Sequence, residues 1–553
     1  MRATNARLSL PSVATAVTLI MGCTGTEPGR DASGTTGAVT AGHPLAAAAG
    51  LRMLESGGNA MDAAITMAAM LAVARPHMNG VGGDMFLLYY DAATQTVQAL
   101  NASGRSGRAA TLENLRARGL TEMPETGPMS VSVPGAVGGW EAALQRFGTR
   151  SWQDVLAPAV ERARAGLPVS ERLALDIAEQ ENKLREDSSA AAIFLPGGAP
   201  PQAGDTLRME ELAETLARIQ SQGAEEFYRG QTAEAIVGYV ERAGGLVTAQ
   251  DFADHAVEWT EPIHRPYDDL EVYAFPPNTQ GVALLSELLQ LTHFDLPAIG
   301  HNTADYFHIL ASVIQQAVAD RDSSVADPVA MRVSVDDLLQ SQRLHAIAGA
   351  IEPTGSAPGA TVTEETQDHP NTVFVSAVDS EGNVVSLIQS LFHAFGSGIV
   401  VPGTGVVLHN RGSLFRFDES HPNVFAPQRR PYHTLSPAMV LKDGAPWLTF
   451  GTPGGDGQAH TLIQVLNNIR FFGMTPQEAI DAPRLRRLPD GSLAIEDRVP
   501  MEVLDALRER GYTVHARTGW TAEFGGAQAI RIMEDGTLRA GADRRREGFA
   551  AAY

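Results

Sequence analysis

The chain has 553 residues, and its 44% hydrophobic content is enough for an extensive core. Its 42 basic and 64 acidic residues give a formal net charge of -22, which argues against phosphate backbones as partners, so we expect no nucleic acid. The single cysteine excludes an intrachain disulfide and a thiolate zinc site, and the 15 histidines lack ligand spacing, so we expect no metal.

Residues 1–36 read as a leader followed by a linker. Arg2 and Arg7 precede a modestly apolar run that ends at Cys23, and residues 24–36 are small and polar. This pattern is typical of a bacterial lipoprotein leader, in which the acylated cysteine becomes the mature N-terminus. We therefore expect a periplasmic or envelope protein whose one membrane contact is a lipid anchor. The alternative is an unstructured extension of a cytoplasmic protein, because serine and threonine weaken the apolar run.

The next part of the chain predicts two helices. The first runs from residue 43 to a stop at Gly57 and Gly58, and Asn59 can cap a second helix over residues 61–73. The second helix is apolar on nearly all faces, which indicates that it is buried.

Strands and further helices follow. Residues 85–91 and 97–101 have the length and composition of two adjacent strands. Residues 150–350 read mostly as amphipathic helix, interrupted by a strand-like run at 270–275. Residues 352–370 lose all apolar periodicity and fill with Pro, Gly, Ser, Thr and acidic residues, as expected for an exposed loop.

The last third of the chain is rich in predicted strands. Residues 373–379 and 384–391 are apolar, β-branched runs joined by Ser-Glu-Gly-Asn, which predicts a hairpin. More strand-like runs follow at residues 398–401, 404–409, 438–441 and 447–450, and residues 460–472 predict a helix. Helices first and strands last fit either two domains or one layered domain whose halves interlock.

Thr372 stands where the loop meets the first strand of this hairpin. A cut between Asn371 and Thr372 would place the threonine hydroxyl beside its own α-amine, which titrates at about pH 8. A useful fraction of that amine is free at neutral pH, so one residue would supply both nucleophile and general base. Taken alone, however, threonine is a common first residue of a strand.

Eight motifs give this threonine a context. In chain order they are HMNGVGGDMF (77–86), SVPGAVGGW (132–140), FPPNTQG (275–281), VSAVDSEGN (375–383), FGSGIV (395–400), RPYHTLSP (430–437), FGTPGG (450–455) and ADRRREGFAAAY (542–553). Together they resemble the γ-glutamyltransferase family of N-terminal-nucleophile hydrolases, and the resemblance runs from about Gly37 to Tyr553.

The resemblance implies an inactive precursor that cleaves itself between Asn371 and Thr372. The products are a helix-rich large chain, residues 37–371, and a strand-rich small chain, residues 372–553. The two chains are expected to fold together as an α+β protein, a four-layer αββα sandwich. The resemblance implies no metal and no organic cofactor.

The resemblance also implies other catalytic residues. Gly454 and Gly455 match the family's oxyanion hole, and glycine lets backbone amides approach a tetrahedral oxygen closely. Ser390 falls where the family has a second hydroxyl that supports the nucleophile. The alternatives are a tight turn at the two glycines and an ordinary solvent-facing strand serine.

The positions that bind the substrate ammonium group in glutathione-acting members carry Phe392, Arg411 and Leu414 here. An ammonium group would meet two apolar side chains and a cation, which disfavours a desolvated positive charge. We therefore expect free γ-glutamyl amines to be poor substrates.

Four residues are candidate ligands for a substrate carboxylate. The resemblance puts Arg105 near the family's carboxylate-binding arginine, and His433 and Thr434 at its paired hydroxyl positions, while Arg411 can reinforce the preference. As alternatives, Arg105 and Arg411 can be surface or loop-ordering residues, and His433 can be a loop histidine whose hydrogen bonds are made within the protein.

The motifs NASGR near residue 103, PHMNG near 78 and RPYHTLSP near 433 resemble the oxamate amidohydrolase branch more than the glutathione branch. We expect an autoprocessing amidohydrolase that acts on a small amide bearing a carboxylate, either oxamate-like or glutaryl-like. The alternatives are a true γ-glutamyltransferase or glutathione hydrolase, and an unprocessed ligand-binding lipoprotein.

Overall fold

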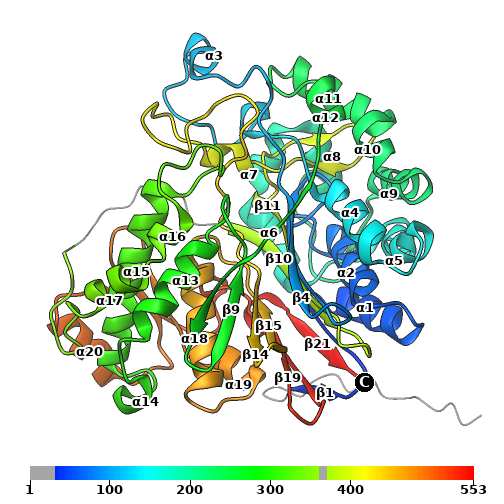
Figure 1. The fold of residues 1–553 in the computed structure, drawn as a ribbon. Helices are drawn as coiled ribbons and strands as arrows, with labels where there is room; N and C mark the ends of the chain where they lie inside the picture. The colour runs from blue at the N-terminus through cyan, green and yellow to red at the C-terminus, as the bar shows by residue number, and fades with distance from the viewer. Residues whose placement is uncertain (1–30, 360–369) are drawn as a thin grey trace, which may run out of the picture.

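Two seven-stranded sheets packed face to face between helices form the fold in the computed structural model, which describes residues 31–359 and 370–553 (Figure 1). This confirms the predicted α+β sandwich. In order across it, sheet 1 consists of β21 (Phe549–Ala552), β2 (Ala38–Ala41), β10 (Pro370–Val378), β11 (Val384–His393), β3 (Asp84–Asp91), β4 (Thr96–Ala102) and β7 (Glu258–Thr260). Sheet 2 consists of β1 (Ala32–Gly34), β20 (Leu538–Ala542), β19 (Gln528–Ile532), β15 (Ala445–Gly451), β14 (Ala438–Lys442), β9 (Leu270–Ala274) and β8 (Ile263–Tyr267).

The predicted hairpin is confirmed as the antiparallel pair β10 and β11, which lies at the centre of sheet 1. Its turn contains Gly382 at φ 85°, a left-handed conformation that glycine adopts without steric cost. The predicted strands at 398–401 and 404–409 are shorter than expected. They reduce to β12 (Val400–Val401) and β13 (Val406–Val407), which pair only with each other.

Helices cover the outer face of each sheet (Figure 1). Sheet 1 lies under α1 (Pro44–Glu55), α2 (Ala60–Ala74), α4 (Ala136–Phe147), α5 (Trp152–Ala165) and α9 (Glu210–Gln222). Sheet 2 lies under α13 (Gly281–Leu291), α15 (Ala304–Ser324) and α18 (Gly457–Arg470).

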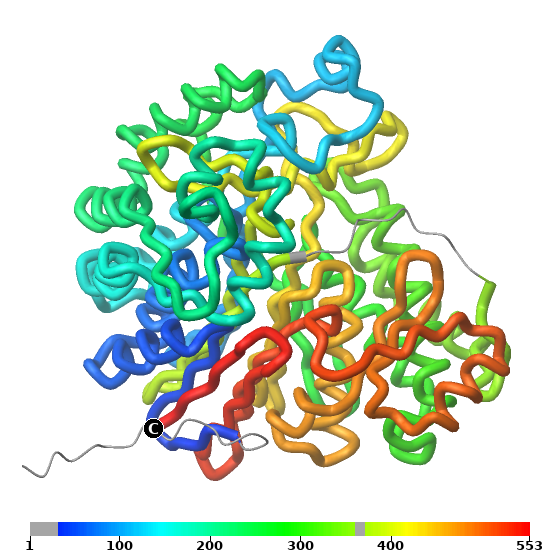
Figure 2. The backbone as a smooth tube through the Cα atoms, turned by 180° about the vertical axis from the view of Figure 1, so that it is seen from behind, coloured from blue at the N-terminus to red at the C-terminus, as the bar shows by residue number. Residues whose placement is uncertain are grey.

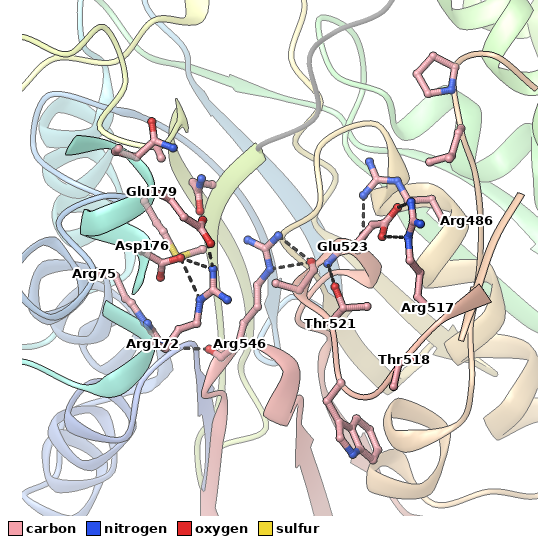
Figure 3. Close-up of a pocket in the computed structure, with 18 of the residues that line it drawn as sticks. Arg75, Arg172, Asp176, Glu179, Arg486, Arg517, Thr518, Thr521, Glu523 and Arg546 are labelled. Atoms are coloured by element: carbon pink, nitrogen blue, oxygen red, sulfur yellow. Dashed lines mark hydrogen bonds and ion pairs between the residues drawn. The ribbon is translucent and has the colours of Figure 1, made fainter. Parts of the chain in front are cut away.

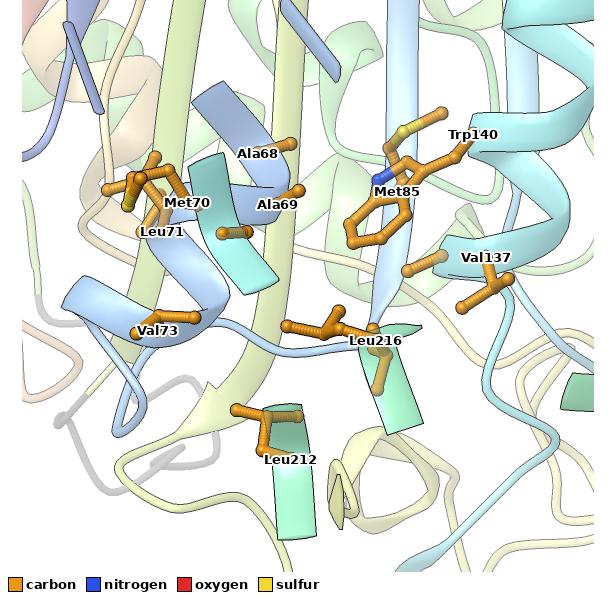
Figure 4. Close-up of a cluster of buried hydrophobic side chains, with 14 of the residues drawn as sticks. Ala68, Ala69, Met70, Leu71, Val73, Met85, Val137, Trp140, Leu212 and Leu216 are labelled. Atoms are coloured by element: carbon orange, nitrogen blue, oxygen red, sulfur yellow. The ribbon is translucent and has the colours of Figure 1, made fainter. Parts of the chain in front are cut away.

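The second predicted helix, α2, is buried along its whole length, as expected. The Asn59 side chain caps it by accepting from the Asp62 amide, and the Asp62 carboxylate accepts in turn from the Asn59 amide. Figure 4 shows Met70 and Leu71 of this helix in the same apolar cluster as Trp140 of α4. The helix therefore forms the centre of the outer core over sheet 1.

A separate apolar layer lies between the two sheets. Phe86 and Phe374 of sheet 1 pack in it with Met439 of sheet 2, and all three are fully buried. Complete burial of a side chain of this size contributes about 1.5–3 kcal/mol. This layer fixes the distance between β10 in one sheet and β15 in the other.

The two predicted chains interleave in both sheets. Strand β2 of the first segment lies between β10 and β21 of the second, and β9 pairs with β14 across the same division. Figure 2 shows the early strand beside the last one at the end of the chain. Each of the two seven-stranded sheets contains strands of both segments, so the structure favours one layered domain.

The N-terminal boundary differs in detail from the expectation. Ala32–Gly34 forms the edge strand β1 of sheet 2, so the ordered fold begins inside the predicted linker. Cys23 and the predicted leader lie outside the described residues. Within residues 31–359 and 370–553, no helix is both long and apolar enough to cross a membrane.

A buried ionic network anchors the C-terminal segment. Arg545 pairs with Glu496 at 2.6 Å and with Asp543 at 3.1 Å, and Arg484 pairs with Asp543 at 2.8 Å. Arg484 also donates to the carbonyl of Phe524 at 2.8 Å. Each buried charge is paired, as the desolvation cost requires, and the network holds the loop after residue 521 in place.

Candidate active site

Thr372 lies in β10 opposite Ser390 of β11, beside an irregularity in the ladder. Asn371 pairs with Phe392 and Thr372 with Ser390, so Leu391 is the extra residue of a β-bulge. The Thr372 side-chain oxygen lies 2.9 Å from the Ser390 hydroxyl, and Thr372 is only 1% exposed. The predicted nucleophile and its supporting hydroxyl are therefore in contact.

The Ser390 hydroxyl also reaches the peptide bond that is predicted to break. Its oxygen lies 3.0 Å from the carbonyl oxygen of Asn371, to which it can donate, and it accepts from the Phe392 amide at 2.8 Å. One serine thus contacts both the attacking hydroxyl and the carbonyl under attack. This arrangement suits attack of the Thr372 oxygen on the Asn371 carbonyl carbon.

The glycine-rich turn before β3 explains why β11 can lie so close. A Cβ on Gly83 would stand 2.6 Å from the Ser390 carbonyl oxygen, and one on Gly82 would stand 2.2 Å from the Val407 carbonyl oxygen. The Met78 carbonyl accepts from the bulged Leu391 amide at 3.0 Å. The turn therefore supports the bulge directly, which only glycine permits.

The predicted oxyanion loop follows β15. A Cβ on Gly451, at the end of that strand, would stand 2.2 Å from the ring of Phe374, two residues after Thr372. Gly454 and Gly455 have φ of 141° and 55°, conformations that side chains disfavour. The close approach of Gly451 to Phe374 thus brings this loop to the start of β10.

The carbonyls of both glycines are fixed by side chains. Arg486 donates to the Gly454 carbonyl at 3.2 Å, and Gln280 donates to the Gly455 carbonyl at 2.9 Å. Because a trans peptide is planar, the Gly455 amide points away from the Gly454 carbonyl. Neither glycine amide donates to another described residue. Both amides can therefore donate to a further group, and their role in an oxyanion hole stays a prediction.

The same loop leads into α18, which begins at Gly457. The positive end of the helix dipole lies at this N-terminus and favours negative charge nearby. It adds to the stabilisation that the two glycine amides would give a tetrahedral oxygen.

Gln280 and Arg321 are parts of the site that we did not predict. The Gln280 side chain donates to the carbonyl of Thr434 as well as to that of Gly455, and its oxygen accepts from Arg321 at 3.1 Å. Arg321 also pairs with Asp456 at 3.0 Å. Gln280 lies in the FPPNTQG motif, in which the glutamine had no predicted role.

Arg411, His433 and Thr434 form one buried cluster with Asp84. The Arg411 guanidinium lies 3.5 Å from the Thr434 hydroxyl, and His433 lies 3.7 Å from the Asp84 carboxylate. Burial lowers the pKa of Arg411 to about 10, raises the pKa of Asp84, and lowers the pKa of His433 well below its usual value. His433 also contacts the Ser103 hydroxyl at 2.7 Å. Burial in this cluster therefore favours the neutral form of the His433 imidazole.

Arg411 has unused hydrogen-bonding capacity. Within the described part of the chain, its Nε and Nη2 donate to no partner, although the side chain is fully buried. Its Cζ lies 4.4 Å from the centre of the Phe392 ring. Two unpaired donors on a buried cation are costly and indicate a site for an anion.

A cleft of about 800 Å³, here called the Phe392 cleft, lies in front of that ring. Leu414, Tyr432, Arg321 and Asp456 also line it. Phe392 has φ 76°, which is uncommon for a non-glycine residue and frequent at functional sites. The structure thus places two of the expected positions, Phe392 and Leu414, on this cleft, with Arg411 behind the ring.

A second cleft has a volume of about 820 Å³ and is here called the Asn371 cleft (Figure 3). Asn371 itself lines it, together with residues of α6 (Glu171–Glu179), β16 (Leu485–Arg487), β18 (Val514–Arg517) and η4 (Ala522–Phe524). Asn371 therefore lies at this cleft, and Phe392, its partner across the ladder, lies at the other.

The structure does not bring Arg105 to either of these clefts. Its guanidinium pairs with Asp327 at 3.0 Å and donates to the Gln428 carbonyl at 3.1 Å, and it lines a smaller, separate cavity with His255. Its role as a carboxylate ligand stays a prediction that this geometry does not support. The ionic pair indicates a loop-ordering arginine.

No group of three or more His, Cys, Asp or Glu side chains that could hold a metal ion occurs among residues 31–359 and 370–553. The site is instead built from hydroxyls, glycine amides and arginines. These groups suit acyl transfer through an oxygen nucleophile.

Known proteins match this chain over most of its length. The chain is 36% identical over 527 residues to the glutathione hydrolase-like YwrD proenzyme of Bacillus subtilis, covering 94% of this chain and 98% of that protein. It is 33% identical over 530 residues to the oxamate amidohydrolase proenzyme of Klebsiella pneumoniae, covering 94% and 99%. The solved structure of cephalosporin acylase from Bacillus halodurans superposes with a TM-score of 0.90 at 33% identity, covering 96% of this chain and 98% of that one.

The family model described as gamma-glutamyltranspeptidase matches residues 46–553, nearly the whole described chain. The first of these relatives matches 94% of the chain, and the fold is similar to that of a solved acylase. The chain belongs to the γ-glutamyltranspeptidase family.

Proposed function

We propose that this protein is an autoprocessing amidohydrolase that cleaves itself before Thr372 and then hydrolyses a small amide bearing a carboxylate on its acyl part. The observation that carries the proposal is the contact of the Ser390 hydroxyl with both the Thr372 oxygen, at 2.9 Å, and the Asn371 carbonyl, at 3.0 Å. Family membership supports it, because relatives carry the names oxamate amidohydrolase proenzyme and acylase proenzyme.

Self-cleavage begins with attack of the Thr372 oxygen on the Asn371 carbonyl carbon. The bond from that carbon to the Thr372 nitrogen breaks, the nitrogen takes the hydroxyl proton, and an ester remains. Water hydrolyses the ester, which leaves a carboxylate on Asn371 and both a free amine and a free hydroxyl on Thr372. The amine can then act as general base.

Substrate hydrolysis repeats this chemistry with a free amine. The Thr372 oxygen bonds to the substrate carbonyl carbon, and the Gly454 and Gly455 amides stabilise the oxyanion, each such donor being worth about 3–4 kcal/mol. The hydroxyl proton passes through the amine to the leaving nitrogen as the amide bond breaks. Water then gives a proton to the amine and its oxygen to the acyl carbon, and Thr372 recovers its proton.

The unpaired donors of Arg411 support a carboxylate on the acyl part. A guanidinium binds a carboxylate through two parallel hydrogen bonds, and the Thr434 hydroxyl beside it can add a third. The Phe392 ring stands against Arg411, so the substrate reaches the guanidinium when this ring turns aside. Oxalyl and glutaryl groups both carry the required carboxylate.

A true γ-glutamyltransferase is the rival, and several relatives carry the name glutathione hydrolase proenzyme. Its substrate would bring an ammonium group to Phe392, Arg411 and Leu414. That environment disfavours a desolvated cation, so we propose hydrolysis of acyl groups without this amine. In an unprocessed binding protein, the contact between the Ser390 hydroxyl and the Asn371 carbonyl would have no function.

Thr372→Ala is expected to stay a single chain without activity, because both nucleophile and base are lost. Wild-type protein should give a smaller chain that begins Thr-Val-Phe-Val, as seen by intact mass and N-terminal sequencing. Thr372→Ser keeps a hydroxyl and should still be cut. A wild-type chain that stays whole after prolonged incubation, or is cut elsewhere, would contradict the proposal.

Ser390→Ala should slow self-cleavage by about 10²-fold, since a donor to the carbonyl under attack is lost. The rate is measured from the loss of precursor on a denaturing gel. Ser386→Ala is the matched control, because Ser386 lies on the same strand, is equally buried, and donates to the Ala438 carbonyl at 3.0 Å. Equal slowing in both variants would make the effect one of strand packing.

Arg411→Met should lower kcat/KM for glutaryl or oxalyl amides by about 10–100-fold, the value of a charged hydrogen bond. The same variant should hydrolyse a neutral acyl amide as fast as wild type does. Steady-state kinetics on paired substrates measures both, and Arg411→Lys should recover part of the loss. An equal loss on both substrates would show that Arg411 acts only on the fold.

The leader motivates a further part of the proposal, an exported protein anchored through Cys23. Expression in a bacterial host with labelled fatty acid should label the large chain, and Cys23→Ser should abolish the label. A large chain that keeps Met1 and takes up no label would favour the cytoplasmic alternative.

A further inference from the structure

The buried guanidinium of Arg411 needs an opposite charge, and the Asp84 carboxylate supplies it. Both residues are 0% exposed. Burial lowers the pKa of Arg411, and Asp84 is the strongest of the groups that raise it, ahead of Tyr432 and Asp456. Burial raises the pKa of Asp84, and His409 and Arg411 are the strongest of the groups that lower it. In the free enzyme, one buried cation is therefore balanced mainly by one buried anion.

The two oxygens of the Asp84 carboxylate have different surroundings. Oδ1 accepts from the Gly104 amide at 3.1 Å and from the Gly135 amide at 3.2 Å. Oδ2 is buried and accepts from none of the residues that the structure describes. The Nε2 atoms of His433 and His409 lie 3.7 Å and 3.9 Å from it, too far for a hydrogen bond. Oδ2 can therefore take up a proton while Oδ1 keeps its two bonds.

Asp84 also lies in line with the nucleophile. It is the first residue of β3 and stands opposite Ser390 of β11, which stands opposite Thr372 of β10. Residues directly opposite each other in antiparallel strands point to the same face of a sheet. Asp84 and Thr372 thus share one face, two strands and about 10 Å apart. An acyl group that extends from Thr372 to Arg411 brings its carboxylate into the surroundings of Asp84.

A substrate carboxylate at Arg411 would be a second buried anion beside Asp84. When two carboxylates share one buried site, the pKa of one of them is strongly raised, so that it takes up a proton. The substrate carboxylate can form two hydrogen bonds to the guanidinium, which favour its ionised form. Asp84 is the one that changes more readily, because its Oδ2 has no hydrogen bond to lose.

The two histidines next to Asp84 are poor acceptors for this proton. The Nδ1 of His409 accepts from the Arg411 backbone amide at 2.9 Å, so a second proton on this ring would break that bond. Burial, followed by the charge of Arg411, lowers the pKa of His433 well below its usual value, and Arg430 acts in the same direction. Both rings therefore stay neutral.

Three further ionisable groups face the cluster, and none of them can take up the proton. The Tyr228 hydroxyl donates to the Pro134 carbonyl at 2.9 Å, and burial raises its pKa. Burial also raises the pKa of Tyr432. Both tyrosines therefore already carry their protons at neutral pH. Asp456 pairs with Arg321 at 3.0 Å, which favours its ionised form.

We propose that Asp84 is the resting counter-ion of Arg411, and that its Oδ2 takes up one proton from solvent when the acyl carboxylate of the substrate binds to Arg411. The proton returns to solvent when the acid product leaves. This rests on the proposed function, because it assumes an acyl group that bears a carboxylate. Since binding raises the pKa of Asp84, affinity for the carboxylate is highest below the pKa of the free enzyme and falls as the pH rises above it.

The test compares two substrates of mature wild-type enzyme. One is a glutaryl or oxalyl amide, whichever is hydrolysed faster, and the other is the amide in which a methyl group replaces the carboxylate. The ratio of their kcat/KM values is measured from about pH 6 to 8.5, where the substrate carboxylate stays ionised. Titration of the Thr372 amine affects both substrates alike and cancels in the ratio. We expect the ratio to fall about ten-fold as the pH rises, a size usual for coupled sites.

Asp84→Asn should make this ratio independent of pH and raise it about ten-fold above wild type at the upper end of the range. A neutral amide takes up no proton and does not compete with the substrate for Arg411, yet its oxygen can still accept from the two glycine amides. Asp379→Asn is the matched control and should keep the wild-type pH dependence. Asp379 is a buried acid directly after β10 that accepts from the amides of Ala60 at 2.9 Å and Asn383 at 3.0 Å. Conversion of each variant into two chains verifies that it has folded.

Difference infrared spectroscopy on wild-type enzyme needs no variant, and it decides the question even where Asp84→Asn fails to mature. The probe is butyrate at saturation, which keeps the chain and the distal carboxylate of a glutaryl group but has no amide. A carbon-13 label on its carboxylate displaces its own band. The band of a protonated, unlabelled carboxyl group should appear on binding, and protonation of a histidine would not produce it.

The outcomes separate this inference from the proposed function. A wild-type ratio that is constant with pH, the absence of the carboxyl band, or an Asp84→Asn ratio that still falls with pH would each overturn the proton uptake and leave the amidohydrolase intact. A wild-type enzyme without preference for the carboxylate would refute the proposed acyl group, and this inference with it. Hydrolysis of neither amide would refute the amidohydrolase itself.

Discussion

The ladder between β10 and β11 is the constraint on which the rest of the site depends. It places Thr372 opposite Ser390, and the bulge at Leu391 lets the serine hydroxyl reach back to the Asn371 carbonyl. Both strands lie at the centre of a seven-stranded sheet, covered on one face by α2 and on the other by the second sheet. A residue held so firmly cannot move toward its target, so the reacting groups must already lie in position.

The supporting parts come from distant regions of the chain and meet at this ladder. Glycines of the turn before β3 permit contact with the Ser390 backbone, and Gly451 permits contact with Phe374. Gln280 then links the Thr434 carbonyl to the Gly455 carbonyl, which ties the cluster around Arg411 to the glycine loop after β15. The glycines of the motifs are therefore explained by close approaches between layers, and the glutamine by the need to orient two loops at once.

Much of this arrangement could be predicted from the sequence. The hairpin over residues 373–391 is a strong local signal, because apolar β-branched runs flank a turn, and Asn59 caps α2 as its position suggested. The pairing of β2 with β10 and β21 joins residues hundreds of positions apart, and no local pattern encodes such a partner. The edge strand at Ala32–Gly34 was missed for a similar reason, since a short polar strand resembles a linker until its partner is known.

The same contrast between local signals and long-range contacts applies to the individual site residues. Thr372, Ser390 and the two loop glycines could be placed from motifs, because they belong to strands and turns with fixed geometry. Arg105 could not, since a long side chain on a loop takes its position from whichever acid is near, here Asp327. Arg321 lies on a helix with no motif of its own, and its link to Gln280 appears only in three dimensions.

The interleaved strands have a consequence for the lifetime of the enzyme. Before the cut, β2 and β10 are parts of one chain, and their pairing is an intramolecular event whose entropy cost grows slowly with the intervening length. After the cut, unfolding releases two separate molecules, and reassembly becomes concentration-dependent. Self-cleavage therefore makes the path back to the native state bimolecular, so the mature enzyme depends on slow unfolding rather than on ready refolding.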